Sequence, residues 1–234
     1  CNLCTYRLPI SFNKEKNSQG TIYVKGMEKN LIVTIKTLKL VRWEDKNIEI
    51  EYHYDEDSKV KDRSYTRKLD LTNAIATTEF ETDQAKFRRE YFVSREADVA
   101  VIRLDADKSK MISVDINLNR QECVEYLTED NAIVMFGQLN DGSNGDEGMK
   151  YLSKLTVNNI GGEVEYKDNK IIVRNADKLT LIFSSATNYK NENYAALVDD
   201  LMNEAKSRNY VPLRKKHIKT YQELFNRVEV DFGE

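Results

Sequence analysis

The chain has 234 residues, of which 40% are hydrophobic, and this size and composition exclude a wholly disordered protein. Its formal charge is −3, from 36 basic and 39 acidic side chains, which argues against nucleic acid as a partner because phosphate binding requires a basic face. Its longest apolar runs have the length of strands, so the sequence predicts no transmembrane segment.

The chain begins with Cys1, and Cys4 follows it at C-x-x-C spacing. No second ligand pair accompanies these thiols and no strand-then-helix pattern surrounds them, so the sequence predicts neither a metal site nor a redox site there. The third cysteine, Cys123, lies far along the chain. We expect a periplasmic or extracellular location, and a lipid anchor on Cys1 is left open.

Apolar and polar residues alternate at period two through most of the chain. In residues 47–54, for example, Ile48, Ile50 and Tyr52 share one face, while Glu49 and Glu51 share the other. Such alternation is typical of strands with one face on a core and one in water. The predicted strands are Thr21–Lys25, Leu31–Val41, Asn47–Tyr54, Ser64–Leu71, Ala74–Glu81, Lys86–Ser94, Val99–Asp105, Met111–Leu118, Cys123–Thr128, Ala132–Gln138, Met149–Val157, Lys170–Arg174 and a strand through Leu179, Leu181 and Phe183.

Polar turn sequences separate these strands. Gly161-Gly162 and Lys167-Asp168-Asn169 predict tight reversals, and residues 140–146 predict a long polar loop. A dozen or more strands with no helix between them indicate a large antiparallel sandwich. The sequence predicts a mainly β fold: a large antiparallel β-super-sandwich followed by two short C-terminal helices and a final strand.

The periodicity changes after Thr187. Asn193–Asn209 is predicted to be a helix that Asn191 or Asn193 caps, and a second helix begins at Val211-Pro212. Arg227–Phe232 then resumes strand alternation. We expect residues 1–190 to form the β-sandwich domain and residues 191–234 a helical linker segment and closing strand packed on the same domain. The stripes predicted for the two helices are Ala196, Leu197, Leu201 and Ala205, and then Leu213, His217, Ile218, Tyr221, Leu224 and Phe225.

Candidate acid–base groups do not form a recognisable catalytic motif. His53 lies on the polar face of a predicted strand, and His217 lies within a helix stripe, where a structural role is favoured. The acidic clusters 55–57, 146–147 and 199–200 fall in turns or on an exposed helix face, and none promises the burial that raises the pKa of a general acid. The sequence therefore predicts no catalytic residue in this chain.

Two further features of the sequence are candidate ligand sites. Asp141, Asp146 and Glu147, with Asn140 and Asn144, could surround a calcium ion, but their spacing does not match an EF-hand and is also ordinary for a polar loop. Trp43 could stack on a sugar ring, but it follows a strongly apolar strand and is interpreted as a core residue. We expect neither a metal site nor a cofactor.

The C-terminal stretch is the most distinctive in the chain, and it reads L-R-K-K-H-I-K-T-Y-Q-E-L-F-N-R-V-E-V-D-F-G over residues 213–233. Three other stretches precede it: Y-T-R-K-L-D-L with A-I-A in 65–76, F-R-R-E-Y-F-V-S with V-I-R-L in 87–104, and N-A-D-K-L-T-L with S-A-T-N-Y in 175–189. Together these resemble, in the same order, the N-terminal domain of glycoside hydrolase family 95. The resemblance covers about residues 45–234.

That resemblance implies a β-super-sandwich followed by helical linker elements, in an enzyme that removes terminal α-L-fucose, or less often L-galactose, with inversion. The family's catalytic acid and base lie in a downstream (α/α)6 barrel, so no catalytic residue is carried over to a chain that stops at Glu234. The expected partners are the downstream catalytic barrel of the same polypeptide and, indirectly, a glycan substrate. Residues 1–44 lack the family's opening pattern.

We therefore expect the non-catalytic N-terminal domain of a bacterial glycoside hydrolase that resembles α-L-fucosidases. An alternative is a stand-alone carbohydrate-binding or surface lipoprotein module. A third hypothesis is an assembly domain whose open sheet face forms an oligomer interface.

Overall fold

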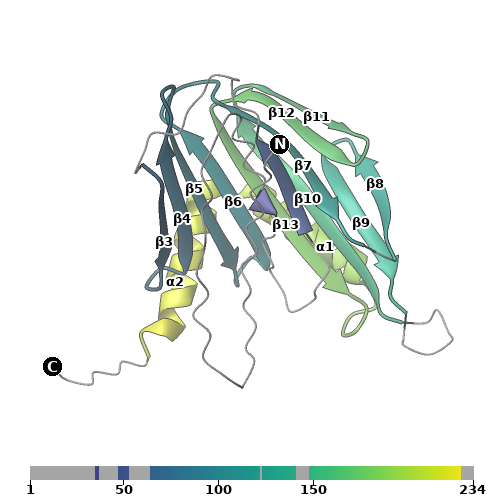
Figure 1. Cartoon of the computed structure of the whole chain (residues 1–234). Helices are drawn as coiled ribbons and strands as arrows, with labels where there is room; N and C mark the ends of the chain where they lie inside the picture. The colour runs from purple at the N-terminus through teal and green to yellow at the C-terminus, as the bar shows by residue number, and fades with distance from the viewer. Residues whose placement is uncertain (1–34, 37–46, 53–63, 122, 141–147, 228–234) are drawn as a thin grey trace, which may run out of the picture.

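The structure is a computed structural model that describes residues 35–36, 47–52, 64–121, 123–140 and 148–227. Within these residues the chain forms antiparallel strands and then two helices (Figure 1). The strands are β1 (Ile35–Lys36), β2 (Asn47–Tyr52), β3 (Thr66–Asp70), β4 (Ile75–Glu81), β5 (Lys86–Ser94), β6 (Val99–Ala106), β7 (Ile112–Asn119), β8 (Glu125–Glu129), β9 (Ala132–Gln138), β10 (Lys150–Ile160), β11 (Glu163–Lys167), β12 (Lys170–Ala176) and β13 (Lys178–Thr187), and the helices are α1 (Tyr194–Ser207) and α2 (Tyr210–Phe225).

The strands form two sheets that pack face to face. One sheet has five strands in the order β1-β2-β7-β12-β11, and the other has eight in the order β3-β4-β5-β6-β13-β10-β9-β8. Every strand pair is antiparallel. The fold is therefore mainly β, a sandwich of two antiparallel sheets followed by two helices, as the sequence predicts.

The main core lies between the two sheets, and alternation in the sequence produces it. In β7, the side chains of Ile112, Val114, Ile116 and Leu118 are buried, while the residues between them are partly exposed. The same core receives Leu179 and Leu181 from β13. Since each side chain of this size contributes about 1.5–3 kcal/mol when it is buried, this alternation stabilises both sheets.

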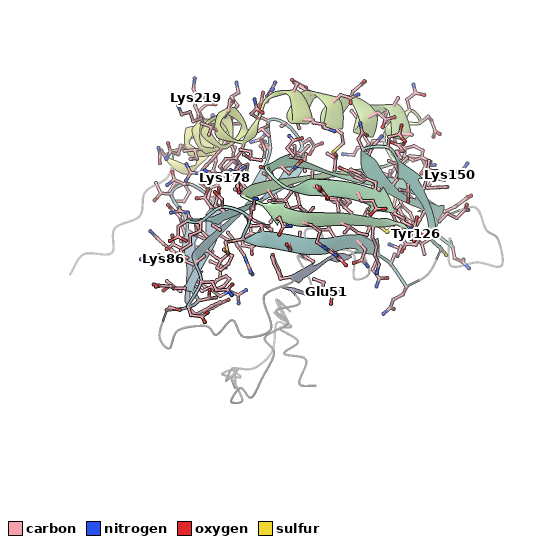
Figure 2. All side chains as sticks on the ribbon, turned by 90° about the horizontal axis from the view of Figure 1, so that it is seen from above. Glu51, Lys86, Tyr126, Lys150, Lys178 and Lys219 are labelled. Carbon is pink, nitrogen blue, oxygen red and sulfur yellow. The ribbon has the colours of Figure 1, made fainter. Side chains whose placement is uncertain are left out.

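A second core lies on the other face of the eight-stranded sheet, beneath the helices. Val99 and Val101 of β6 and Ile182 of β13 pack there with Val198 and Met202 of α1. Figure 2 shows both helices on one side of the sheet, with Lys219 of α2 pointing away from it. The structure thus has three layers: the five-stranded sheet, the eight-stranded sheet and the helices.

Both predicted helices are confirmed, but two details of α1 differ from the prediction. Its buried residues are Val198, Met202 and Ala205, while Leu197 of the predicted stripe is 37% exposed. Asn193 is the N-cap residue, but its side chain makes no capping hydrogen bond. Instead, the side chain of Asn191 accepts a hydrogen bond of 2.9 Å from the backbone N–H of Asn193, which closes a turn before the helix.

The turn residues behave as expected. Gly161 and Gly162 both have φ +68°, and a Cβ on Gly162 would lie 2.2 Å from the carbonyl oxygen of Arg174, so this reversal requires glycine. It leads into β11, a strand that the sequence analysis missed. The predicted strand Thr21–Lys25, most of the predicted Leu31–Val41 and the closing strand after Arg227 lie outside the described residues.

Candidate functional site

The most elaborate polar site in the described part of the chain is the contact between α2 and the edge of the eight-stranded sheet. We call it the helix-docking site and define it as Tyr210, Arg214, His217 and Gln222 of α2, Glu90 of β5, and the turn of residues 71–74 between β3 and β4. Figure 1 shows α2 crossing the sheet at β3, β4 and β5. Stretches that are far apart in the sequence therefore meet here.

Glu90 is the centre of this site. Its outward position in β5 places its carboxylate beneath α2, where its side chain is only 7% exposed. One carboxylate oxygen accepts hydrogen bonds from the Tyr210 hydroxyl and from Arg214 Nε at 3.2 Å. The other accepts from Arg214 Nη2 at 3.3 Å and from Arg88 Nη2 at 2.9 Å. The three contacts from Tyr210 and Arg214 join β5 to α2 across 120–124 residues of sequence, and the contact from Arg88 lies within β5.

The electrostatics keep Glu90 ionised. Burial acts to raise its pKa, but the hydrogen bonds from Tyr210, Arg88 and Arg214 outweigh burial and hold the pKa below its ordinary value. Burial and the neighbouring Glu90 carboxylate raise the pKa of Tyr210, which therefore stays a protonated hydrogen-bond donor. The guanidinium of Arg103 lies 4.9 Å from the centre of the Tyr210 ring, so a cation also holds the ring in place.

His217 provides the second fixed contact. Its Nε2 lies 3.0 Å from the carbonyl oxygen of Asn73 and 3.1 Å from that of Ala74, and because both groups are acceptors, Nε2 carries the hydrogen. The ring stacks on Phe92 at 4.7 Å and on Tyr221 at 6.3 Å. Burial lowers the pKa of His217 despite these carbonyls, so the ring is neutral at neutral pH.

The β3–β4 turn is built to receive these contacts. Asp70 accepts hydrogen bonds of 3.1 Å from the backbone N–H groups of Thr72 and Asn73, which fixes the turn. Gln222 Nε2 then donates to the carbonyl of Thr72 at 3.3 Å and to the side-chain oxygen of Asn73 at 3.1 Å. Ala74 has φ +51°, a strained value for a residue with a Cβ. Asp70 therefore holds the turn from the end of β3, and Gln222 holds it from α2.

A cleft of about 180 Å³ opens beside this site, and we call it the β3–β5 cleft. Its floor is the outward face of β3, β4 and β5, and Arg214 of α2 forms one wall. Asp70, Glu79 and Glu90 all line it. The hydrogen bond from the Asn73 side chain lowers the pKa of Asp70, and Glu90 is ionised as well, so neither has the raised pKa of a general acid for glycoside hydrolysis.

The other residues singled out in the sequence are not part of this site. Asp199 and Asp200 are both exposed on α1, as predicted, and Asp199 pairs with Lys154 of β10 at 2.7 Å at the side of the helix that meets the sheet. Cys123 is an exposed free thiol in the described structure. Cys1, Cys4, Trp43, His53, the acidic residues 55–57 and the loop residues 141–147 lie outside the described residues.

The described residues include neither a cluster of metal-ligating side chains nor a helix that could cross a membrane. No three His, Cys, Asp or Glu side chains among them are grouped as metal ligands would be. None of their helices has both the length and the apolar character needed to span a bilayer.

Sequence reasoning found His217 but missed Glu90, Tyr210 and the turn at Asn73 as a joint site. The available signal was indirect. Asp70, Glu90, Arg103 and Arg214 belong to three of the stretches that carry the family resemblance, and those stretches meet in the structure. The sequence could therefore have singled out these residues, because they belong to motifs that occur in the family's order. The motifs do not show that the residues contact one another.

Comparison with known proteins agrees with the fold. The family model described as "Glycosyl hydrolase family 65, N-terminal domain" matches residues 47–192. A solved structure titled "Putative kojibiose phosphorylase from human microbiome" superposes with a TM-score of 0.52 at 15% sequence identity, over 76% of this chain and 27% of the other. That likeness shows a shared fold.

Curated relatives carry fucosidase names. "Alpha-L-fucosidase 2" of Arabidopsis thaliana is 24% identical over 216 residues, which cover 80% of this chain and 25% of the relative. "Probable alpha-fucosidase A" of Aspergillus oryzae is 26% identical over 71% of this chain and 25% of the relative, and the protein of that name from Aspergillus niger is 28% identical over 70% and 22%. The chain spans about a quarter of the length of these relatives.

Proposed function

Because the chain belongs to the family of glycosyl hydrolase family 65 N-terminal domains, we propose that it is the non-catalytic N-terminal β-sandwich domain of a bacterial α-L-fucosidase-like enzyme of glycoside hydrolase family 95. In this proposal a catalytic (α/α)6 barrel follows the chain in the same polypeptide and acts on the glycan. The fucosidase names of three relatives, each about four times longer than the matched segment, support it.

The helix-docking site is the observation that carries the proposal. A domain that positions a following domain has to fix the direction in which its last helix leaves. Here α2 is held at its first turn through Tyr210 and Glu90 and near its end through Gln222 and the β3–β4 turn. Directional hydrogen bonds at two points along a helix define its orientation more narrowly than apolar packing does.

The proposal extends to the domain division and the location. In this proposal residues 1–190 form the β-sandwich domain. Residues 191–234 form a helical linker segment and a closing strand that pack on that same domain. The chain works in the periplasm or outside the cell, with a lipid on Cys1 as a testable feature. Mass spectrometry of the protein isolated from its natural source tests the lipid directly, because a lipidated Cys1 adds the mass of its acyl chains.

The first experiment compares the chain with its longer gene product. The chain of residues 1–234 and the full reading frame are assayed with an aryl α-L-fucoside and a natural α-L-fucosylated glycan. We expect turnover from the full product and none from the chain. Turnover by the chain that disappears with Glu79→Gln, or a reading frame that ends at codon 234, would contradict the proposal.

A second experiment tests the positioning role. Gln222→Ala and the matched exposed variant Glu223→Ala are introduced into the full gene product. We expect Gln222→Ala to lower kcat for the fucoside while it leaves the unfolding midpoint of the barrel unchanged, because it loosens only the approach of the two domains. Equal kcat values for both variants would argue against positioning by this site.

A further inference from the structure

We propose that the β3–β5 cleft binds one neutral sugar ring. The cleft lies on the outward face of the sheet edge, and its residues come from three adjacent antiparallel strands and from α2. Strand pairing fixes the spacing of side chains on this floor, so a ligand would not have to order them. Preorganisation of this kind lowers the cost of binding.

The charge balance of the cleft selects the class of ligand. Lys68, Arg88 and Arg214 contribute three positive charges, and Asp70, Glu79 and Glu90 contribute three negative charges. An anion would face the three carboxylates, and a cation would face the three basic groups. A neutral molecule with many hydrogen-bonding groups meets neither repulsion.

The arrangement of these charges suits hydroxyl groups. Glu79 Oε1 accepts a hydrogen bond from Arg88 Nη1 at 3.2 Å, and both side chains are 51% exposed. A sugar hydroxyl is at once donor and acceptor, so two neighbouring hydroxyls can donate to a carboxylate and accept from a guanidinium placed side by side. The hydroxyls of Thr66 and Thr77 extend this surface, and both side chains line the cleft.

Size limits the ligand to a single ring. The cleft holds about 180 Å³, which is below the roughly 300–1,000 Å³ of pockets that enclose drug-sized ligands. Ile75 is the one apolar residue of the lining, but it is only 2% exposed and packs into the core beneath the helices, and the lining includes no aromatic side chain. With few contacts and no aromatic platform, we expect a dissociation constant on the order of 1 mM.

The test is a titration of the isotope-labelled 234-residue chain followed by NMR. The probes are methyl α-L-fucopyranoside, D-galactose and D-glucose, with inorganic phosphate and acetate as anionic probes. We expect saturable shifts for at least one sugar at backbone amides of residues 66–79 and 88–90. Shifts that fail to saturate for every sugar, or tighter binding of phosphate at the same amides, would overturn the proposal.

Substitutions of cleft residues test whether the sugar binds in the β3–β5 cleft. Glu79→Gln keeps the shape of the side chain but removes its charge, and Thr77→Val removes one hydroxyl, so each should weaken sugar binding by about fivefold or more. Glu165→Gln, on the five-stranded sheet, is the control and should bind as the unaltered chain does. Unfolding midpoints of all three are measured to show that the fold persists. Equal affinity in Glu79→Gln and Glu165→Gln would contradict the assignment, whereas the proposed positioning role of α2 does not depend on this result.

Discussion

The two helices lie on the same face of one sheet, yet the contacts that hold them differ in kind. α1 covers β13 and β10 with Val198, Met202 and Ala205, which are 0–4% exposed, and this contact is mainly apolar, with an ion pair between Asp199 and Lys154 of β10 at its edge. α2 covers β5 and the β3–β4 turn with a shorter apolar contact, in which Leu213 is 1% exposed, and with the polar contacts of the helix-docking site.

The apolar contact of α1 mainly stabilises the fold, whereas the polar contacts of α2 mainly fix the orientation of that helix. Burial of apolar surface is favourable in any direction, so α1 mainly contributes to the free energy of unfolding. Hydrogen bonds require defined distances and angles, and a buried charge that loses its partners is costly. The contacts of Glu90 and His217 therefore fix where α2 lies, and they do so at a smaller net gain in stability.

The largest loss of stability is expected from a substitution in the apolar contact between α1 and the sheet. Met202→Ala removes a side chain that is 4% exposed beneath α1, and it should lower the free energy of unfolding by about 2–5 kcal/mol. Urea unfolding followed by circular dichroism measures this loss. Leu197→Ala, in the same helix but 37% exposed, is the matched control and should cost less than about 1 kcal/mol. Equal losses would mean that α1 is not anchored by its buried face.

A smaller and more local effect is expected at Glu90. Glu90→Gln keeps the volume of the side chain but removes the charge that Arg88 and Arg214 share, and it should cost about 1–3 kcal/mol. Hydrogen exchange should show that α2 loses protection while α1 keeps it. Glu204→Gln, whose carboxylate is 55% exposed on α1, is the control. Loss of protection in both helices together would show that they dock as one unit.

Acid should weaken the α2 contact in two steps. The folded-state pKa of His217 is lowered, so its stabilising effect is complete above the unfolded value near 6.5 and is lost as pH falls from there through the folded pKa. Glu90 also has a lowered pKa, and its effect is lost at lower pH, as pH falls below its ordinary value of 4.5. Hydrogen exchange of α2 across this range should show both losses.

One variant separates the two steps. His217→Gln can still donate a hydrogen bond to the turn but does not titrate, so it should remove the step that begins as pH falls below 6.5 and leave the step below pH 4.5. If the upper step persisted in this variant, another group would have to cause it, and the neutral state assigned to His217 would be wrong.

Much of the fold follows from alternation alone, and its failures have physical causes. β11 was missed because it has only two half-buried apolar residues, Val164 and Tyr166, and its register depends on pairing with β12. The buried face of α1 was misplaced because two stripes at helical spacing overlap in its sequence. Contact with the sheet, rather than the helix itself, decides that Val198 and Met202 face inward and Leu197 does not.

The helix-docking site was less accessible to sequence reasoning. Nothing local distinguishes Glu90 from Glu79, since both alternate outward in neighbouring strands, yet one side chain is 7% exposed and the other 51%. The difference comes from α2, which begins 120 residues after Glu90 and brings Tyr210 to it. The lowered pKa of Glu90 depends in part on partners that lie 120–124 residues away in the sequence. It could therefore be predicted only from the three-dimensional structure.

The smallest effect is expected at the outer end of α2. Gln222→Ala removes two hydrogen bonds, of 3.3 Å to the carbonyl of Thr72 and 3.1 Å to the side chain of Asn73, from a position that water can reach. Because water replaces partners at such a position, the free energy of unfolding should fall by less than about 1 kcal/mol. Hydrogen exchange should nevertheless quicken in the last turn of α2 while the turn at His217 is unchanged. A loss as large as that of Glu90→Gln would instead mean that the β3–β4 turn, held by Gln222 as well as by Asp70, is the main anchor of the helix.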